Sequence, residues 1–136
     1  MANTSPIFVL RPQVVAATFV NGDGTTPKDL VTALNRPDGI KVQRIAVHSD
    51  DTAAVNLMLS LHDGSTAYKV GAVRVAVGSG NDGAVAAVNL LAATMLPWLD
   101  ADGELFLPSG WKVQVHPLVA VTAAKTVTIV AFAGEY

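Results

Sequence analysis

The strongest constraint on the fold is the alternation of apolar and polar residues in short Val-rich runs, with Gly-containing turns between them. A period of two places the apolar side chains of a strand on one face. The clearest unit is a pair of such runs, 53–62 and 66–77, on either side of Asp63-Gly64. Asp-Gly favours a two-residue type I′ turn, whose central residues both need φ above zero. The pattern therefore predicts an antiparallel hairpin.

Other runs along the chain also indicate strands. Pro12 cannot donate to a ladder, so it marks an edge, a bulge or a strand that changes sheet. The alternation slips by one residue within Ile40–His48, which predicts a β-bulge near Gln43 and Arg44. The run Ala84–Leu91 is Ala-rich, which favours a helix, but its surroundings favour a strand, and we interpret it as a strand. The predicted strands are 7–10, 13–20, 29–34, 40–48, 53–62, 66–77, 84–91, 104–107, 111–116 and 125–133.

The fold class follows from the number and length of these runs. The chain has 136 residues, a usual size for one domain. About eight short antiparallel strands with little helix predict an all-β, single-domain β-sandwich of jelly-roll type. The polar start Met-Ala-Asn-Thr-Ser predicts a flexible N-terminal arm over residues 1–5, so the sandwich is expected over residues 6–136.

Composition narrows the classes of partner. Charged residues make up 15% of the chain, against about 25% in an average soluble domain. We therefore expect part of the surface to be covered by a partner or by a second copy. The net charge of −2 and the lack of a basic block argue against nucleic-acid binding. The apolar runs are shorter than the ~20 residues that span a bilayer, so we expect no membrane partner.

No group of residues stands out as catalytic, and we expect no enzymatic activity, cofactor or metal. Each of His48, His62 and His116 lies at or near a strand end on a polar parity, where a solvent-facing side chain is the simplest interpretation. The segment Asp100-Ala-Asp-Gly-Glu104 begins like a calcium loop but lacks the remaining ligands, so turn chemistry explains it better. For the aromatic residues, including Trp98 and Trp111, packing in the core or in an interface is favoured over a sugar platform.

Three segments carry a resemblance to a known class of protein. They are Leu105-Phe-Leu-Pro-Ser-Gly-Trp-Lys-Val-Gln-Val115, Val127-Thr-Ile-Val-Ala-Phe-Ala-Gly-Glu-Tyr136 and Ile40-Lys-Val-Gln-Arg-Ile-Ala-Val47. Together they resemble jelly-roll cement or decoration proteins of the heads of tailed bacteriophages. The resemblance implies a structural protein that binds the major capsid protein lattice and stabilises the head. It also implies a homodimer or homotrimer at a capsid symmetry axis, on the capsid exterior, after assembly in the host cytoplasm.

Two apolar segments are poorly explained by strand alternation, and we predict that they contact the capsid or a neighbouring subunit. One lies in the N-terminal arm and the other follows the Ala-rich run. The predicted contact residues are Asn3, Thr4, Ser5, Pro6, Ile7, Phe8, Met95, Leu96, Pro97, Trp98 and Leu99.

Two other functions stay open from the sequence. A carbohydrate- or receptor-binding jelly roll of a phage tail or head fibre predicts exposed Trp or Tyr side chains in a groove lined by loops. An enzyme such as a cupin-like metal protein needs His48, His62 and His116 to converge.

Overall fold

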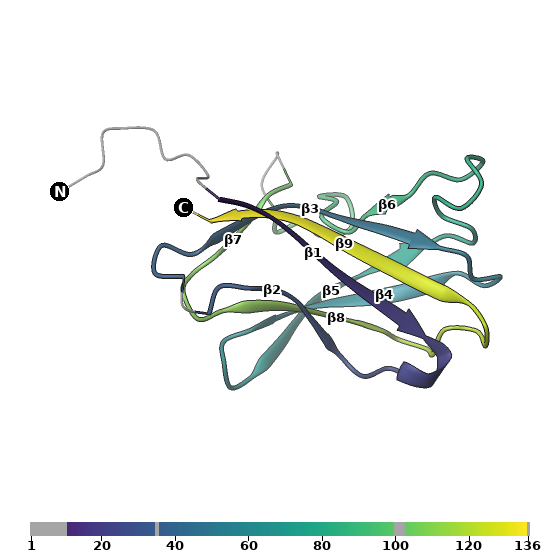
Figure 1. The fold of residues 1–136 in the computed structure, drawn as a ribbon, viewed down its shortest axis with the longest axis horizontal. Coiled ribbons are helices and arrows are strands. Elements are labelled where there is room, and N and C mark those ends of the chain that lie inside the picture. Colours follow the sequence, from purple (N-terminus) through teal and green to yellow (C-terminus); the bar gives the residue numbers. More distant parts are fainter. Residues whose placement is uncertain (1–10, 35, 100–102, 136) are drawn as a thin grey trace.

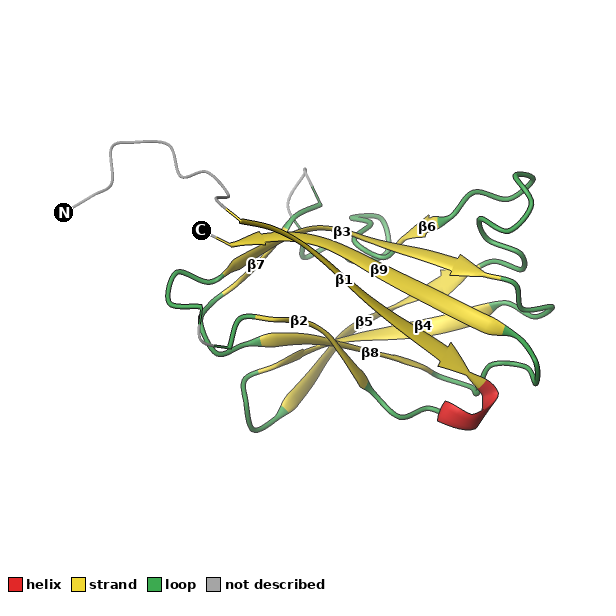
Figure 2. Ribbon diagram, viewed as in Figure 1, coloured by secondary structure: helices red, strands yellow, loops and turns green. Residues whose placement is uncertain are grey.

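Two antiparallel β-sheets face each other across one apolar core in the computed structural model, which describes residues 11–34, 36–99 and 103–135 (Figure 1). The all-β class is confirmed, with one 3-10 turn at Asn21–Asp23 as the helical element of the described ranges (Figure 2). Sheet A has the order β1 (Arg11–Val20), β9 (Thr126–Glu135), β3 (Ile40–Ser49) and β6 (Val88–Asn89), with β7 (Leu105–Leu107) also paired to β3. Sheet B has the order β2 (Lys28–Thr32), β8 (Lys112–Pro117), β4 (Val55–His62) and β5 (Ala67–Val75).

The core forms where the inward positions of the two sheets meet. Phe19, Ile45 and Ile129 from sheet A and Leu57 and Leu59 from sheet B are buried. Most of their neighbours in sequence are more exposed, as a period of two requires. Ser60 beside Leu59 is buried, where the register of β4 against β5 shifts. Burial of a Leu, Ile or Phe side chain contributes about 1.5–3 kcal/mol, so these alternating positions hold the sheets together.

The connections pair distant parts of the chain. β1 pairs with β9, β2 with β8, and β4 with β5, while β3 pairs with β6, β7 and β9. The segment 90–99 then crosses the side of the sandwich: the Leu90 amide donates to Ile45 in β3, and the Trp98 indole donates to Val70 in β5. One side of the core is thereby closed by a segment without strands.

Two sequence predictions about pairing are confirmed. The register of β3 against β9 shifts between Val42 and Arg44, so the bulge lies at Gln43. The strand predicted over 13–20 is β1, which lies at the edge of sheet A and contains Pro12. An edge position suits proline, which has no amide hydrogen to donate. The strand predicted over 7–10 lies outside the described residues.

The hairpin between β4 and β5 is confirmed, but its predicted two-residue turn is wrong. The last pair is His62 with Ala67, so the loop holds the four residues from Asp63 to Thr66. The Asp63 carboxylate accepts hydrogen bonds from the amides of Ser65 and Thr66 at 2.9 and 2.8 Å. Gly64 has a φ of 102°, whereas Asp63 is not among the residues with positive φ. The aspartate side chain thus caps a wider turn than the dipeptide alone suggested.

The strand predicted over Ala84–Leu91 is largely wrong. Only Val88 and Asn89 pair with β3, and Ala84–Ala87 are exposed. The Asn89 side-chain oxygen accepts from the amides of Ile45 and Leu91, both at 3.1 Å, and so occupies the place of a ladder carbonyl. The alanines bury too little apolar surface to hold a strand in the sheet. No helix in the described ranges is both long and apolar enough to cross a lipid bilayer.

Candidate interaction surface

The three histidines do not form a site. His48 lies on β3 of sheet A, whereas His62 and His116 lie on β4 and β8 of sheet B. The sequence predicted a solvent-facing His116, but this side chain is buried. Its burial, and then the charge of Lys69, lower the pKa of His116 below the ordinary 6.5. Within residues 11–34, 36–99 and 103–135, no three His, Cys, Asp or Glu side chains are grouped so that they could hold a metal ion.

Asp51 is buried and fastens two loops at one end of the sandwich. Its carboxylate accepts from the Thr122 amide at 2.9 Å, the Thr122 hydroxyl at 2.7 Å and the Ala53 amide at 2.9 Å. Burial alone raises the pKa of Asp51, but the hydrogen bonds from Thr122, Ala53 and Thr52 outweigh it and hold the pKa below 3.8. Asp51 therefore serves as a structural acceptor in its ionised form.

Replacing Asp51 by asparagine is expected to lower the free energy of unfolding at pH 7 by about 1–3 kcal/mol, because an amide nitrogen then faces buried donors. Because the pKa of Asp51 is lower in the folded chain than the unfolded value of about 3.9, its ionised carboxylate stabilises the fold above that pH. This stabilisation is lost as the pH falls through the folded pKa. The difference between wild type and Asp51→Asn should therefore shrink below pH 4 in urea titrations. Asp82→Asn, at an exposed side chain that caps Ala84, is the control. An Asp51→Asn deficit that is constant with pH would contradict this role.

The other acidic groups singled out in the sequence also have structural partners. Asp50 accepts from the Thr126 amide at 2.7 Å. Glu135, the acid of the C-terminal Gly-acid-Tyr motif, is buried and forms ion pairs with Arg11 and Arg36. Asp100 and its neighbours up to residue 102, like Tyr136, lie outside the described residues.

The predicted contact segment Met95–Leu99 divides into two kinds of residue. Leu96 and Leu99 are buried in the core. Met95 is 51% and Trp98 42% exposed, and Pro97 is exposed between them. Met95, Pro97 and Trp98 thus form the outer side of the segment that crosses from sheet A to β5. We call these three exposed residues the side wall. Asn3, Thr4, Ser5, Pro6, Ile7 and Phe8 lie outside the described residues, and the contact role of both segments stays a prediction.

An aromatic pair lies near the β4–β5 hairpin. The rings of Tyr68 and Trp111 stack with centroids 6.2 Å apart and planes at 25°. Trp111 packs against the core, and the Tyr68 hydroxyl donates to Asp63 at 3.2 Å. Packing therefore accounts for Trp111, as the sequence favoured, while Tyr68 stays half-exposed.

The outer face of sheet A exposes large apolar side chains. Val14 on β1 is 66% exposed, Phe132 on β9 40% and Phe106 on β7 54%. Val14 and Phe132 are cross-strand partners, so their side chains lie on one face about 5 Å apart at Cβ. The outer residues of sheet A between β1 and β7 therefore form one surface, which we call the apolar face.

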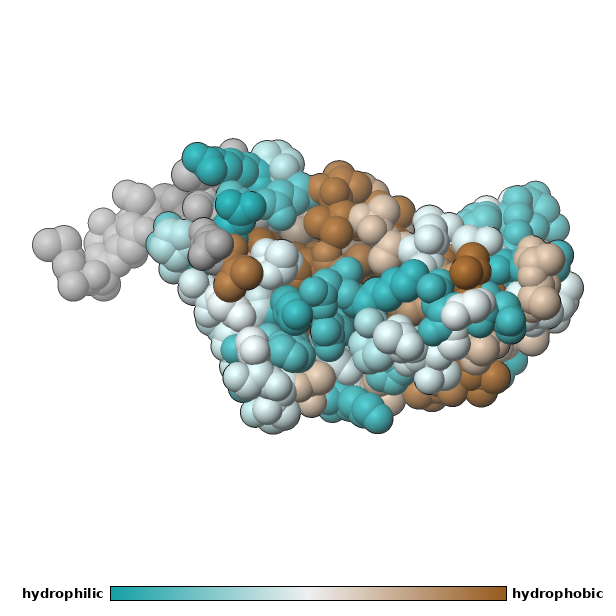
Figure 3. Space-filling view, turned by 60° about the horizontal axis from the view of Figure 1, so that its bottom comes forward, coloured by the Kyte–Doolittle hydropathy of each residue, from teal (hydrophilic) through white to brown (hydrophobic). Residues whose placement is uncertain are grey.

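The outer face of sheet B is polar by comparison. Asp29 on β2 accepts from Gln114 at 2.8 Å and from Lys112 at 3.2 Å, both on β8. The Gln114 amide and then the Lys112 ammonium hold the pKa of Asp29 below 3.8, against the opposing effect of burial. Figure 3 brings this side forward and shows a hydrophilic band across the middle of the molecule. The two faces of the sandwich thus differ in chemistry, and the apolar face is the candidate interaction surface.

The apolar face was not among the contact sites predicted from the sequence. The sequence nevertheless contains a pattern that indicates this face, because Phe106 stands between Leu105 and Leu107, and Phe132 between Ala131 and Ala133. Alternation places each of these phenylalanines on the side opposite to its buried neighbours. Comparisons with protein-family models and with curated proteins found no match to this chain.

Proposed function

We propose that this chain is a non-enzymatic structural protein of a tailed-phage virion, a capsid cement or decoration protein that binds the major capsid protein lattice. The apolar face carries the proposal, because Val14, Phe106 and Phe132 are exposed together on one side of a sandwich with few charges. Large apolar side chains that are exposed on one face are typical of protein interaction sites. Repeated copies on a symmetric shell add avidity to each contact.

The strand order supports the finer assignment as a jelly roll. The pairings β1–β9, β2–β8, β3 with β6 and β7, and β4–β5 are nested, as in one long hairpin rolled into two sheets. Pairs β3–β9 and β4–β8 then close the roll. A double-sheet jelly roll leaves edge strands such as β1 that neighbouring subunits can cover.

Co-sedimentation with empty shells of the major capsid protein tests the proposal. We expect the chain to sediment with the shells at a fixed copy number for each symmetry axis, and shells that carry it to resist heating better, because a ligand of the assembled lattice stabilises it. No binding to the shells, together with retention of glycans by a monomer, would favour a receptor-binding module instead.

Deletion of residues 1–8 is expected to abolish binding to the shells while the domain stays folded. The reason is that the predicted arm contacts precede β1, which pairs with β9 along Arg11–Val20 and is left intact by the deletion. Thermal unfolding checks the fold of the truncated chain, and co-sedimentation measures its binding. Unchanged shell occupancy would remove the arm from the contact.

A further inference from the structure

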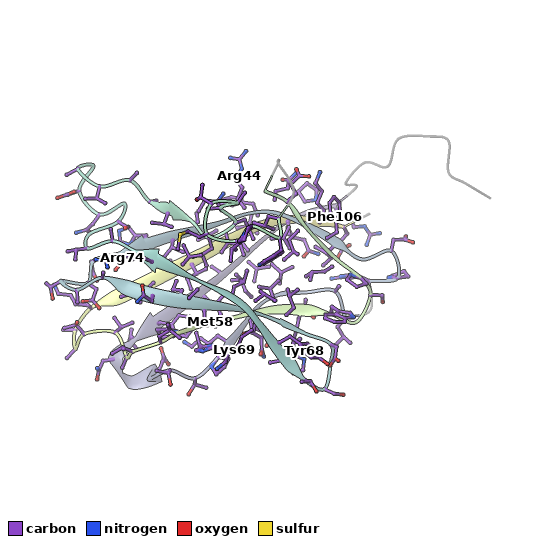
Figure 4. The ribbon with its side chains drawn as sticks, turned by 180° about the vertical axis from the view of Figure 1, so that it is seen from behind. Arg44, Met58, Tyr68, Lys69, Arg74 and Phe106 are labelled. Atoms are coloured by element: carbon purple, nitrogen blue, oxygen red, sulfur yellow. The ribbon has the colours of Figure 1, made fainter. Side chains whose placement is uncertain are left out.

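We propose that the apolar face docks on an apolar patch of the capsid protein that presents a carboxylate to Arg44. This inference rests on the proposed function and names the chemistry of its partner. It comes from the cross-strand registers of sheet A, from the charges on its outer positions and from the size of the face. Figure 4 shows Arg44 and Phe106 on the upper side of the sandwich, away from Met58, Lys69 and Tyr68.

Arg44 lies among the apolar residues of this face. The register places Phe132 between Val14 on one neighbouring strand and Arg44 on the other. Phe106 pairs in register with Lys41, which lies on the same strand as Arg44. Directly opposed residues have Cβ atoms about 4.5–5.5 Å apart, so a partner that covers Phe132 also covers the stem of Arg44.

The charge of Arg44 is available to a partner. Arg44 is exposed and has no ion-pair partner in the described part of the chain. Lys41 differs, because its ammonium lies 2.8 Å from the Glu104 carboxylate. Covering Arg44 without a partner charge leaves a buried guanidinium unpaired, which is strongly unfavourable. A carboxylate pairs with a guanidinium through two parallel hydrogen bonds and removes this cost.

Among the described strand positions of this face, a second copy of this chain offers no carboxylate without a partner, because Glu104 at its edge already pairs with Lys41. The outward positions in the described residues include Pro12, Val14, Ala16, Thr18 and Val20 on β1, Thr128, Val130 and Phe132 on β9, Lys41, Gln43, Arg44, Ala46 and His48 on β3, and Phe106 on β7. None of these is acidic. Two such faces packed against each other would bury two arginines without a partner charge. Symmetric packing of two such faces is therefore disfavoured, and we take an acidic site of the capsid protein as the occupant.

The size of the face fits the centre of a specific interface. With a rise of about 3.4 Å per residue and a strand spacing of about 4.8 Å, three ten-residue strands cover roughly 34 by 14 Å. That is on the order of 500 Å² of flat area, against about 800 Å² per partner in a standard interface. Met95 and Trp98 are also exposed, on the segment that runs from β3 to β5 at the side of the sandwich.

The test compares Arg44→Glu, Arg44→Gln and Phe132→Ser with Arg74→Glu in binding to empty shells of the major capsid protein. Arg74 is the matched control, because it is an exposed arginine on β5 of sheet B without an ion-pair partner in the described residues. We expect Arg44→Glu to weaken binding by about tenfold or more, and Arg44→Gln less, while Arg74→Glu leaves it unchanged. Thermal unfolding confirms that each full-length variant is folded.

The outcomes separate the two proposals. Equal binding by wild type, Arg44→Glu and Phe132→Ser overturns the docking of the apolar face and leaves the cement function standing. No binding by wild type overturns both. Light scattering of the chain alone adds a third outcome: a wild-type dimer that Phe132→Ser converts to monomer identifies a second copy as the occupant and overturns the inference.

Discussion

Replacing Leu96 by alanine is expected to lower the free energy of unfolding by about 2–5 kcal/mol, the usual cost of truncating a buried leucine. Leu96 is fully buried, and its side chain packs against Gly71 so closely that a Cβ at that glycine would overlap it. Urea denaturation measures the change. Met95→Ala is the matched control, because Met95 is half-exposed and the substitution should stay within about 0.5 kcal/mol.

The comparison of Leu96 with Met95 also separates packing from binding in the predicted contact segment. If the side wall contacts the capsid, Met95→Ala weakens binding to shells and leaves the stability unchanged. Leu96→Ala is expected to act through the fold. Equal stability losses for the two variants would show that the segment is not seated in the core as described.

Replacing Gly39 by alanine is expected to lower the free energy of unfolding by about 2–4 kcal/mol. Gly39 has a φ of 79°, and an added Cβ would overlap the backbone carbonyl of Leu107. That overlap can be relieved only by moving the backbone between β2 and β3 or the end of β7. Both the strained φ and the lost packing therefore contribute.

Gly78→Ala is the control that measures the cost of the positive φ without a steric overlap. Gly78 has a φ of 68°, but a Cβ there meets nothing within 4 Å. Its cost is expected to be about 1 kcal/mol, as for an alanine in a left-handed conformation. Thermal unfolding of both variants checks the difference. Indistinguishable melting temperatures would mean that the close approach of Gly39 to Leu107 is relieved at no cost.

The hairpin illustrates how far local sequence reaches. Two alternating runs around Asp63-Gly64 were sufficient to predict β4 and β5, because burial of one face is encoded in each strand. The turn is four residues long and not two as predicted, because the Asp63 side chain accepts hydrogen bonds from the amides of Ser65 and Thr66. Local hydrogen bonds of this kind compete with the turn geometry that a dipeptide prefers.

By itself the sequence determined most of the described strands, the sandwich class and the bulge at Gln43, since a period of two and a slip in that period are properties of consecutive residues. Tertiary structure alone decided that Ala84–Ala87 stay outside the sheet and that Leu96 and Leu99 enter the core. It also decided that Phe132 lies between Val14 and Arg44. Those neighbours are more than eighty residues away in the chain, and the register that joins them depends on packing between strands rather than on local pattern.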